Sequence, residues 1–194
     1  MNRRQLSSQV LLNNQQHSQI LFGNRVPKDF FITSGIGESD ITVHAGSYHL
    51  ALKEAGIEMC NIMTYSSILP KIANEISKPE KLVHGSVMET ISAVANSTKG
   101  VIATAGIIFG LLYDRTTGEK YGGLVCEYNG NDEEAVAGLS LQSSLKEIYN
   151  NGYSERFELK DIKLTMRSFV PKKKYGTALI ALCFTNYVVP ILNN

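Results

Sequence analysis

The chain has 194 residues, of which 43% are hydrophobic, and this is enough for one domain with its own buried core. Its formal net charge is only +1, which argues against a nucleic acid or an anionic membrane bound through bulk electrostatics. No run approaches the roughly 18 apolar residues of a membrane-spanning helix, and the amino-terminal residues lack the apolar core of a secretion signal. We therefore expect a cytoplasmic protein with no membrane or nucleic-acid partner.

The three cysteines, Cys60, Cys126 and Cys183, are far apart, and each sits in an apolar run. Their odd number and wide spacing favour buried thiols in a reducing compartment over a disulfide framework. Neither the cysteines nor the four histidines show the spacing of metal ligands. We therefore predict no metal site.

The first half of the chain predicts an arm followed by alternating elements. Residues 1–24 are polar and rich in amides, which predicts a loose arm or, alternatively, an oligomer-clasping segment, before a single domain over residues 25–194. The run DFFITSG predicts a strand that ends in a glycine-rich turn, SGIGESD, where Gly35 and Gly37 could alternatively hold an anion. HAGSYHLALKEAG then predicts an amphipathic helix that Gly56 ends, and IEMCNIMTY predicts a short strand.

The second half predicts further strands and one long helix. Three strands are expected in succession, in KLVHGSVMETISAVANS, GVIATAGIIFGLLYD and YGGLVCEYNG. Asn131 is expected to cap a helix with an acidic start, DEEAVAGLSLQSSLKEIYNNG. Two last strands, FELKDIKLTMRSFV and KYGTALIALCFTNYV, flank the cluster Lys172–Lys174, which we interpret as a solvated hairpin end. This order indicates an α+β fold, a layered sandwich with antiparallel or mixed sheets.

The stretch MTYSSILP places two adjacent serines, Ser66 and Ser67, directly after an apolar strand. A serine hydroxyl can attack the carbonyl of the preceding residue when the backbone is strained and the oxyanion is supported, which turns the peptide into an ester. β-Elimination would then cleave the chain and leave dehydroalanine, and hydrolysis of that group would release ammonia and leave a pyruvoyl group. The alternative is an ordinary Ser-Ser turn, which is the more common structure for such a dipeptide.

Together with its flanking segments, this stretch resembles the pyruvoyl-dependent arginine decarboxylases. The resemblance covers roughly Val26 to Phe184 and rests on GIGESD, a helix ending in AGI, CNIMTY, SSILP, HGSVMETI and GGLVCEY, which occur in family order. It implies a four-layer αββα sandwich and an intact zymogen that cleaves itself between residues 66 and 67 into chains 1–66 and 67–194. It also implies a homotrimer or a dimer of trimers, with the site between neighbouring subunits.

The resemblance further implies roles for individual residues. Ser67 would supply the covalent pyruvoyl group, Ser66 would become the carboxyl end of the smaller chain, and Asn61 and Glu127 would act at the catalytic site, Glu127 as the proton donor. The pyruvoyl group would form a Schiff base with L-arginine, and loss of CO2 would give agmatine for polyamine biosynthesis or acid resistance.

Two of these residues can also be weighed from the sequence itself. Glu127 lies in an apolar strand, where burial would keep its carboxyl protonated, and the alternative is a glutamate on the outer face of that strand. Six extended residues, about 20 Å, separate Asn61 from Ser67, so the two share a site only if the chain turns back or moves after cleavage.

One position departs from the family pattern. Where the family has an acidic residue in the first helix to bind the guanidinium group, this chain has His49, which cannot offer a bidentate carboxylate. Glu38 or Asp40 could supply that charge to the substrate instead. Three functions stay open: an arginine decarboxylase, a pyruvoyl decarboxylase of another amino acid, and an unprocessed, non-enzymatic trimeric binding protein.

Overall fold

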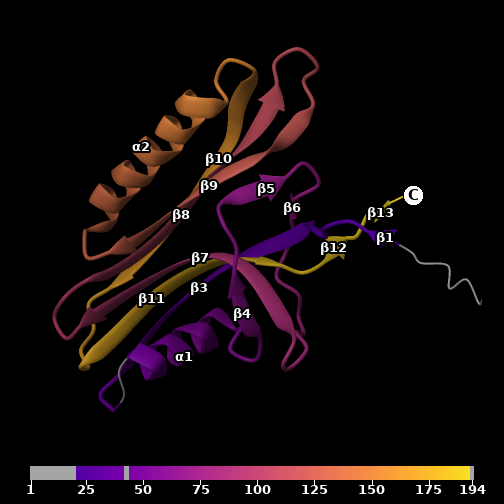
Figure 1. Cartoon of the computed structure of the whole chain (residues 1–194). Helices are drawn as coiled ribbons and strands as arrows, with labels where there is room; N and C mark the ends of the chain where they lie inside the picture. Colours follow the sequence, from indigo (N-terminus) through magenta and orange to yellow (C-terminus); the bar gives the residue numbers. More distant parts are fainter. Residues whose placement is uncertain (1–20, 42–43, 193–194) are drawn as a thin grey trace, which may run out of the picture.

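The computed structural model describes residues 21–41 and 44–192, which form two β-sheets between two helices. A five-stranded sheet has the strand order β4-β7-β11-β3-β6, and a four-stranded sheet has the order β10-β8-β9-β5. Helix α1 (His44–Ala55) covers the outer face of the first sheet, and helix α2 (Glu134–Gly152) covers that of the second (Figure 1). This arrangement confirms the predicted αββα sandwich.

Both sheets are largely antiparallel. The five-stranded sheet consists of β3 (Asp29–Ser39), β4 (Asn61–Thr64), β6 (Asn74–Glu75), β7 (Val87–Thr98) and β11 (Tyr175–Phe184). The four-stranded sheet consists of β5 (Ile68–Pro70), β8 (Ala103–Asp114), β9 (Lys120–Gly130) and β10 (Phe157–Phe169). The short contacts of β3 with β6 and of β4 with β7 are parallel, so the five-stranded sheet is mixed, as expected.

Three apolar clusters fill the three interfaces between the layers. One lies between the sheets, one lies between α1 and its sheet, and one lies between α2 and its sheet. Ile107 and Ile108 are neighbours on β8, yet Ile107 points into the space between the sheets and Ile108 points toward α2. This alternation is the period of two that a strand buried on both faces requires.

The segment SGIGESD is a strand, so both the predicted turn and its alternative, an anion-holding loop, are wrong. Strand β3 pairs with β11 without interruption as far as Ser39. A Cβ atom at Gly35 would lie 2.0 Å from the carbonyl oxygen of Ala51, and one at Gly37 would lie 2.1 Å from that of Ser47. The two glycines are there because α1 packs directly on the backbone of β3.

The other predicted elements are largely present. Helix α1 ends where predicted, with Gly56 in the left-handed region at φ +66°. The strand expected in IEMCNIMTY is shorter, because residues 57–60 form a turn. Asn131 does not cap α2: the residue at the cap is Glu133, and the Asn131 side chain donates a hydrogen bond to the carbonyl of Ile102 (2.6 Å). The cluster Lys172–Lys174 is an exposed turn between β10 and β11, as predicted.

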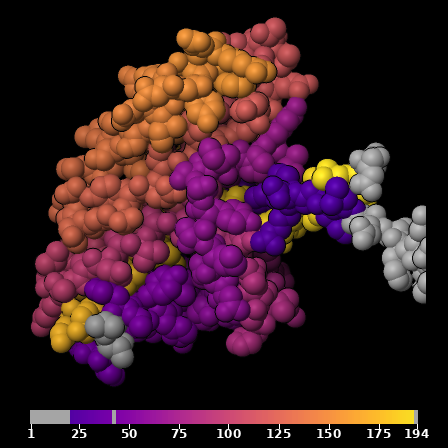
Figure 2. Space-filling model, viewed as in Figure 1, coloured from indigo at the N-terminus to yellow at the C-terminus, as the bar shows by residue number. Residues whose placement is uncertain are grey.

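The two ends of the described chain pair in a short ribbon beside the sandwich. Strand β1 (Leu21–Phe22) pairs with β13 (Ile191–Leu192), and β2 (Val26–Pro27) pairs with β12 (Tyr187–Val188). The ribbon extends away from the sandwich (Figures 1 and 2). Most of the predicted arm, residues 1–20, lies outside the described residues.

The three cysteines are buried free thiols, as predicted. Burial, with a smaller contribution from the charge of Glu127, raises the pKa of Cys126 to about 11, and burial raises that of Cys183 to about 12. Among residues 21–41 and 44–192, no group of three or more His, Cys, Asp or Glu side chains could hold a metal ion. None of the described helices has the length and hydropathy needed to cross a membrane.

Candidate active site

Ser67 lies in the crossing segment, which joins β4 of the five-stranded sheet to β5 of the four-stranded sheet, and these two strands are labelled in Figure 1. On the side of the five-stranded sheet, the backbone N–H of Tyr65 donates a hydrogen bond to the carbonyl of Thr90 (2.7 Å). On the side of the four-stranded sheet, the backbone N–H of Val125 donates one to the carbonyl of Ser67 itself (3.0 Å). The peptide bond between Ser66 and Ser67 therefore lies between two anchored points, one on each sheet, while Ser66 is exposed.

The side chain of Ser67 contacts Glu127. Its hydroxyl oxygen lies 2.9 Å from each carboxylate oxygen of Glu127, to which it donates a hydrogen bond. On β9, Val125 points between the sheets and Cys126 points toward α2, so the next residue, Glu127, again faces the space between the sheets. Both Ser67 and Glu127 are half-buried. The carboxylate is thus placed to accept the proton of the Ser67 hydroxyl.

Asn61 lies at the opposite end of β4 from Ser67. Its side-chain amide donates a hydrogen bond to the carbonyl of Gly85 (2.8 Å), and its backbone N–H donates one to the carbonyl of Ser86 (2.8 Å). The strand runs extended from Asn61, so about 13 Å separate it from Tyr65 and the chain does not turn back. Within one chain, Asn61 and Ser67 are not brought together.

Glu38 and Asp40 bind the turn between β10 and β11. The Glu38 carboxylate accepts hydrogen bonds from the backbone N–H groups of Lys172 (2.7 Å) and Lys173 (3.3 Å), and that of Asp40 accepts one from Lys174 (2.9 Å). Each carboxylate therefore has a local partner that orders this turn.

The same end of the sheet is remote from Ser67. Thr90, which binds the segment before Ser67, pairs with Cys183, whereas Glu38 pairs with Gly176, which precedes Cys183 by seven residues of β11 and thus lies about 23 Å from it. His49 is exposed on α1. A single chain brings Ser67 and Glu127 together but does not bring His49, Glu38 or Asp40 to them.

Sequence reasoning missed a second carboxylate between the sheets, that of Glu89 on β7. Its side chain is only 1% exposed and forms an ion pair with Arg25. A signal was available, because VMETISAV has one ionisable residue in an otherwise apolar or small strand, as GGLVCEY does.

Exposed apolar side chains lie on β4 and β5, on either side of the crossing segment, and at the start of β7, which pairs with the far end of β4. Met63, Ile68 and Val87 are 51%, 54% and 55% exposed, respectively, and they lie on β4, β5 and the start of β7. Large apolar residues grouped in this way usually mark a surface that another molecule covers.

A model of the pyruvoyl-dependent arginine decarboxylase family matches residues 29–189. The pyruvoyl-dependent arginine decarboxylases AaxB of Chlamydia muridarum and Chlamydia caviae are each 32% identical over 190 residues, covering 86% of this chain and 94% of the relative. The pyruvoyl-dependent arginine decarboxylase of Thermoplasma volcanium is 28% identical over 138 residues, covering 69% of this chain and 73% of the relative. Ser67 and Glu127 both lie within the matched range.

Proposed function

Because this chain belongs to the pyruvoyl-dependent arginine decarboxylase family, we propose that it cleaves itself at Ser67 and converts L-arginine to agmatine and CO2. The observation that carries the proposal is the 2.9 Å contact between the Ser67 hydroxyl and the Glu127 carboxylate. The residues present fit a pyruvoyl group, since the proposed precursor Ser67 is fixed to β9 through its carbonyl and already contacts a carboxylate.

In the proposed processing reaction, Glu127 takes the proton from Ser67 Oγ, and Oγ attacks the carbonyl carbon of Ser66. The new C–O bond replaces the C–N bond of the peptide, and the nitrogen of residue 67 takes up a proton, so the chain is now joined by an ester. Removal of the Cα proton of residue 67 then breaks its Cβ–Oγ bond. Ser66 leaves as a carboxylate, and water converts the remaining dehydroalanine to the pyruvoyl group as ammonia departs.

In turnover, the pyruvoyl carbonyl supplies an attachment point for the substrate's amino group and draws electrons from the bond to the departing carboxylate. The Ser67 oxygen has by then left with Ser66, so Glu127 no longer has that hydroxyl as its partner. Its carboxyl lies beside residue 67, where it can give a proton to the carbon that has lost CO2.

A second candidate is decarboxylation of a different amino acid. It is favoured by the exposed His49, which stands where the family's guanidinium-binding acid is expected and offers no carboxylate. Assay of the purified protein with arginine, lysine, ornithine and neutral amino acids separates the two candidates. A kcat/KM for arginine at least tenfold higher than that for each other amino acid supports the first candidate, arginine decarboxylation.

We further propose that the protein assembles in the cytoplasm as a homotrimer or a dimer of trimers, with the substrate bound between neighbouring subunits. The exposed side chains of Met63 and Ile68, on the two strands that flank Ser67, support a partner at this surface. Light scattering after size-exclusion chromatography should give the mass of three or six chains. A monomer at micromolar concentration would contradict the proposal.

The decisive experiment is an intact-mass spectrum of the purified protein under denaturing conditions. We expect two chains, 1–66 and 67–194, with the larger chain lighter by the mass of ammonia than a product that begins with an intact serine. A single uncut chain that persists on incubation would instead favour a non-enzymatic binding protein.

A further inference from the structure

Glu89 is a nearly fully buried carboxylate, and Arg25 is its one partner among the described residues. Glu89 lies on the same face of β7 as Ile91 and Ala93, which belong to the cluster between the sheets. Its side chain is 1% exposed and pairs with Arg25, and apart from Arg25 no described residue donates a hydrogen bond to either carboxylate oxygen. An ionised carboxylate accepts about four hydrogen bonds. A group in the position of Arg25 is therefore the main hydrogen-bond donor that Glu89 can have.

The guanidinium group of Arg25 also contacts an aromatic ring. Its central carbon lies 5.2 Å from the centre of the Tyr187 ring, within the range of a cation–π interaction. The Tyr187 hydroxyl is buried and has no hydrogen-bond partner among the described residues, and burial raises the pKa of Tyr187 to about 12. A carboxylate, which a planar guanidinium fork binds through two hydrogen bonds, and an aromatic face, on which it stacks, are both groups that recognise guanidinium.

Arg25 enters this position from the solvent. Its side chain is 53% exposed, although that of its partner Glu89 is 1% exposed. Arg25 directly precedes β2, so it belongs to the ribbon that extends from the sandwich and not to either main sheet. Arg25 therefore reaches from the surface to a carboxylate that is itself buried.

The position is also close to the crossing segment. The backbone N–H of Tyr65 bonds to Thr90, the residue after Glu89, and the Tyr65 ring lies 5.9 Å from that of Phe184. Tyr65 is two residues before Ser67.

We propose that Glu89 and Tyr187 form a binding site for a guanidinium group, which Arg25 fills in the intact chain and which the guanidinium group of a small ligand can fill in its place. The evidence for this site is the set of contacts that Arg25 makes. Only the identity of its natural ligand, arginine or agmatine, rests on the proposed function. It provides the carboxylate that His49 does not.

The test is ligand rescue of an Arg25→Ala variant of the full chain. Removing Arg25 leaves Glu89 buried without a counter-charge, and we expect the melting temperature to fall by roughly 5–10 °C. Agmatine at millimolar concentration should restore at least half of that loss and should shift the unaltered protein much less. Putrescine, which has an amine in place of the guanidinium group, should restore little. None of these measurements needs cleavage or turnover, so they stand apart from the proposed function.

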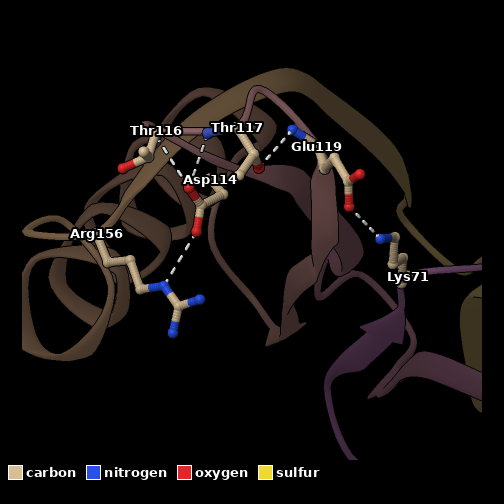
Figure 3. A network of polar contacts seen from close by, with 6 residues as sticks. All are labelled: Lys71, Asp114, Thr116, Thr117, Glu119 and Arg156. Atoms are coloured by element: carbon tan, nitrogen blue, oxygen red, sulfur yellow. Dashed lines mark hydrogen bonds and ion pairs between the residues drawn. The ribbon is translucent and has the colours of Figure 1, made fainter.

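Arg156 provides a matched control. It pairs with Asp114 (3.1 Å), and its guanidinium carbon lies 5.1 Å from the Phe157 ring, but Asp114 also accepts hydrogen bonds from the backbone N–H groups of Thr116 and Thr117 (Figure 3). Arg156→Ala therefore leaves a carboxylate that still has partners. Agmatine should stabilise this variant no more than the unaltered protein.

The double variant Arg25→Ala with Glu89→Gln removes both charges, so it should melt higher than Arg25→Ala and gain nothing extra from agmatine. If Arg25→Ala is insoluble, Arg25→Lys keeps a cation at Glu89, and agmatine should still stabilise it more than the unaltered protein. The proposal is overturned if agmatine shifts the Arg25 variant no more than the unaltered protein, or if putrescine or the double variant gives the same rescue.

Discussion

Glu127 and Glu89 both point from apolar strands into the space between the sheets, but they have opposite partners. Glu127 accepts hydrogen bonds from the neutral hydroxyl of Ser67, whereas Glu89 faces the cation of Arg25. A neutral donor leaves a carboxylate able to take up and return a proton, while a nearby cation favours its charged form. Position in an apolar strand therefore does not define the role of a carboxylate, and the roles that we propose for Glu127 and Glu89, proton transfer and guanidinium binding, follow from their partners.

The largest expected effect comes from removing the partner of Glu127. Ser67→Ala removes the attacking oxygen, so both cleavage and agmatine formation should be abolished. Denaturing gels would measure cleavage, and an assay of released CO2 would measure decarboxylation. Ser66→Ala is the control, because its side chain is exposed and its carbonyl carbon, the proposed target, is retained. Any cleavage of Ser67→Ala between residues 66 and 67 would refute the assignment.

Replacing Glu127 itself should have the next largest effect. Glu127→Gln keeps the shape but cannot accept or donate the proton, so the rate of cleavage and the kcat of any processed fraction should each fall about 100-fold or more. Glu134→Gln is a matched control, since the Glu134 carboxylate also accepts a hydrogen bond from a serine hydroxyl, that of Ser168 (2.8 Å), on the exposed surface. Equal behaviour of the two variants would reject a special role for Glu127.

Glu89→Gln should lower stability and leave self-cleavage at Ser67 unchanged. The amide keeps one acceptor for Arg25 but loses the charge, and its own N–H donors are buried, so we expect about 1–3 kcal/mol of destabilisation. Urea unfolding measures this effect, and the extent of cleavage should stay that of the unaltered protein. A loss of cleavage as large as that of Glu127→Gln would remove the distinction between the two carboxylates.

Replacing Asp114 should have the smallest effect on stability, and this effect should depend on pH. The backbone N–H groups of Thr117 and Thr116, followed by Arg156, hold the pKa of Asp114 below its ordinary value of 3.8. Because the pKa is lower in the folded state, the charge stabilises the fold above the unfolded pKa, and this contribution is lost as pH falls through the folded pKa. Asp114→Asn should therefore be slightly less stable than the unaltered chain at pH 7, and this gap in urea midpoint should close at low pH. A gap of unchanged size at pH 2 would contradict this explanation.

The sequence predicts the layers well because each element has a local signal. Residues 103–114 and 120–130 are long apolar runs bounded by turns, and α1 is ended by Gly56. The resemblance to the family also singled out Ser67 and Glu127, whose contact the structure contains. Periodicity alone could not have paired them, because they are 60 residues apart in the chain.

The misread segments depend on tertiary contacts. Gly35 and Gly37 look like turn residues, and only the packing of α1 on β3 explains them as strand. Asn131 is a residue type that often caps helices, but its side chain donates a hydrogen bond to the carbonyl of Ile102 instead. The pairing of Arg25 with Glu89 joins residues that the sequence places in unrelated segments, so no local pattern predicts it.

The strand order determines how the protein could refold before and after cleavage. Strands β3 and β4 precede Ser66, yet β3 lies between β11 and β6, and β4 lies beside β7, all three of which follow it. A cut between residues 66 and 67 would thus leave two polypeptides with interleaved strands, and neither could depart without dismantling a sheet. The uncut precursor carries all of these strands in one chain, so its subunit fold would form by a first-order process before any assembly. After denaturation of the cleaved protein, the two polypeptides would have to associate again, so the yield of refolded protein would depend on concentration. Cleavage would therefore make the folding of each subunit irreversible in practice.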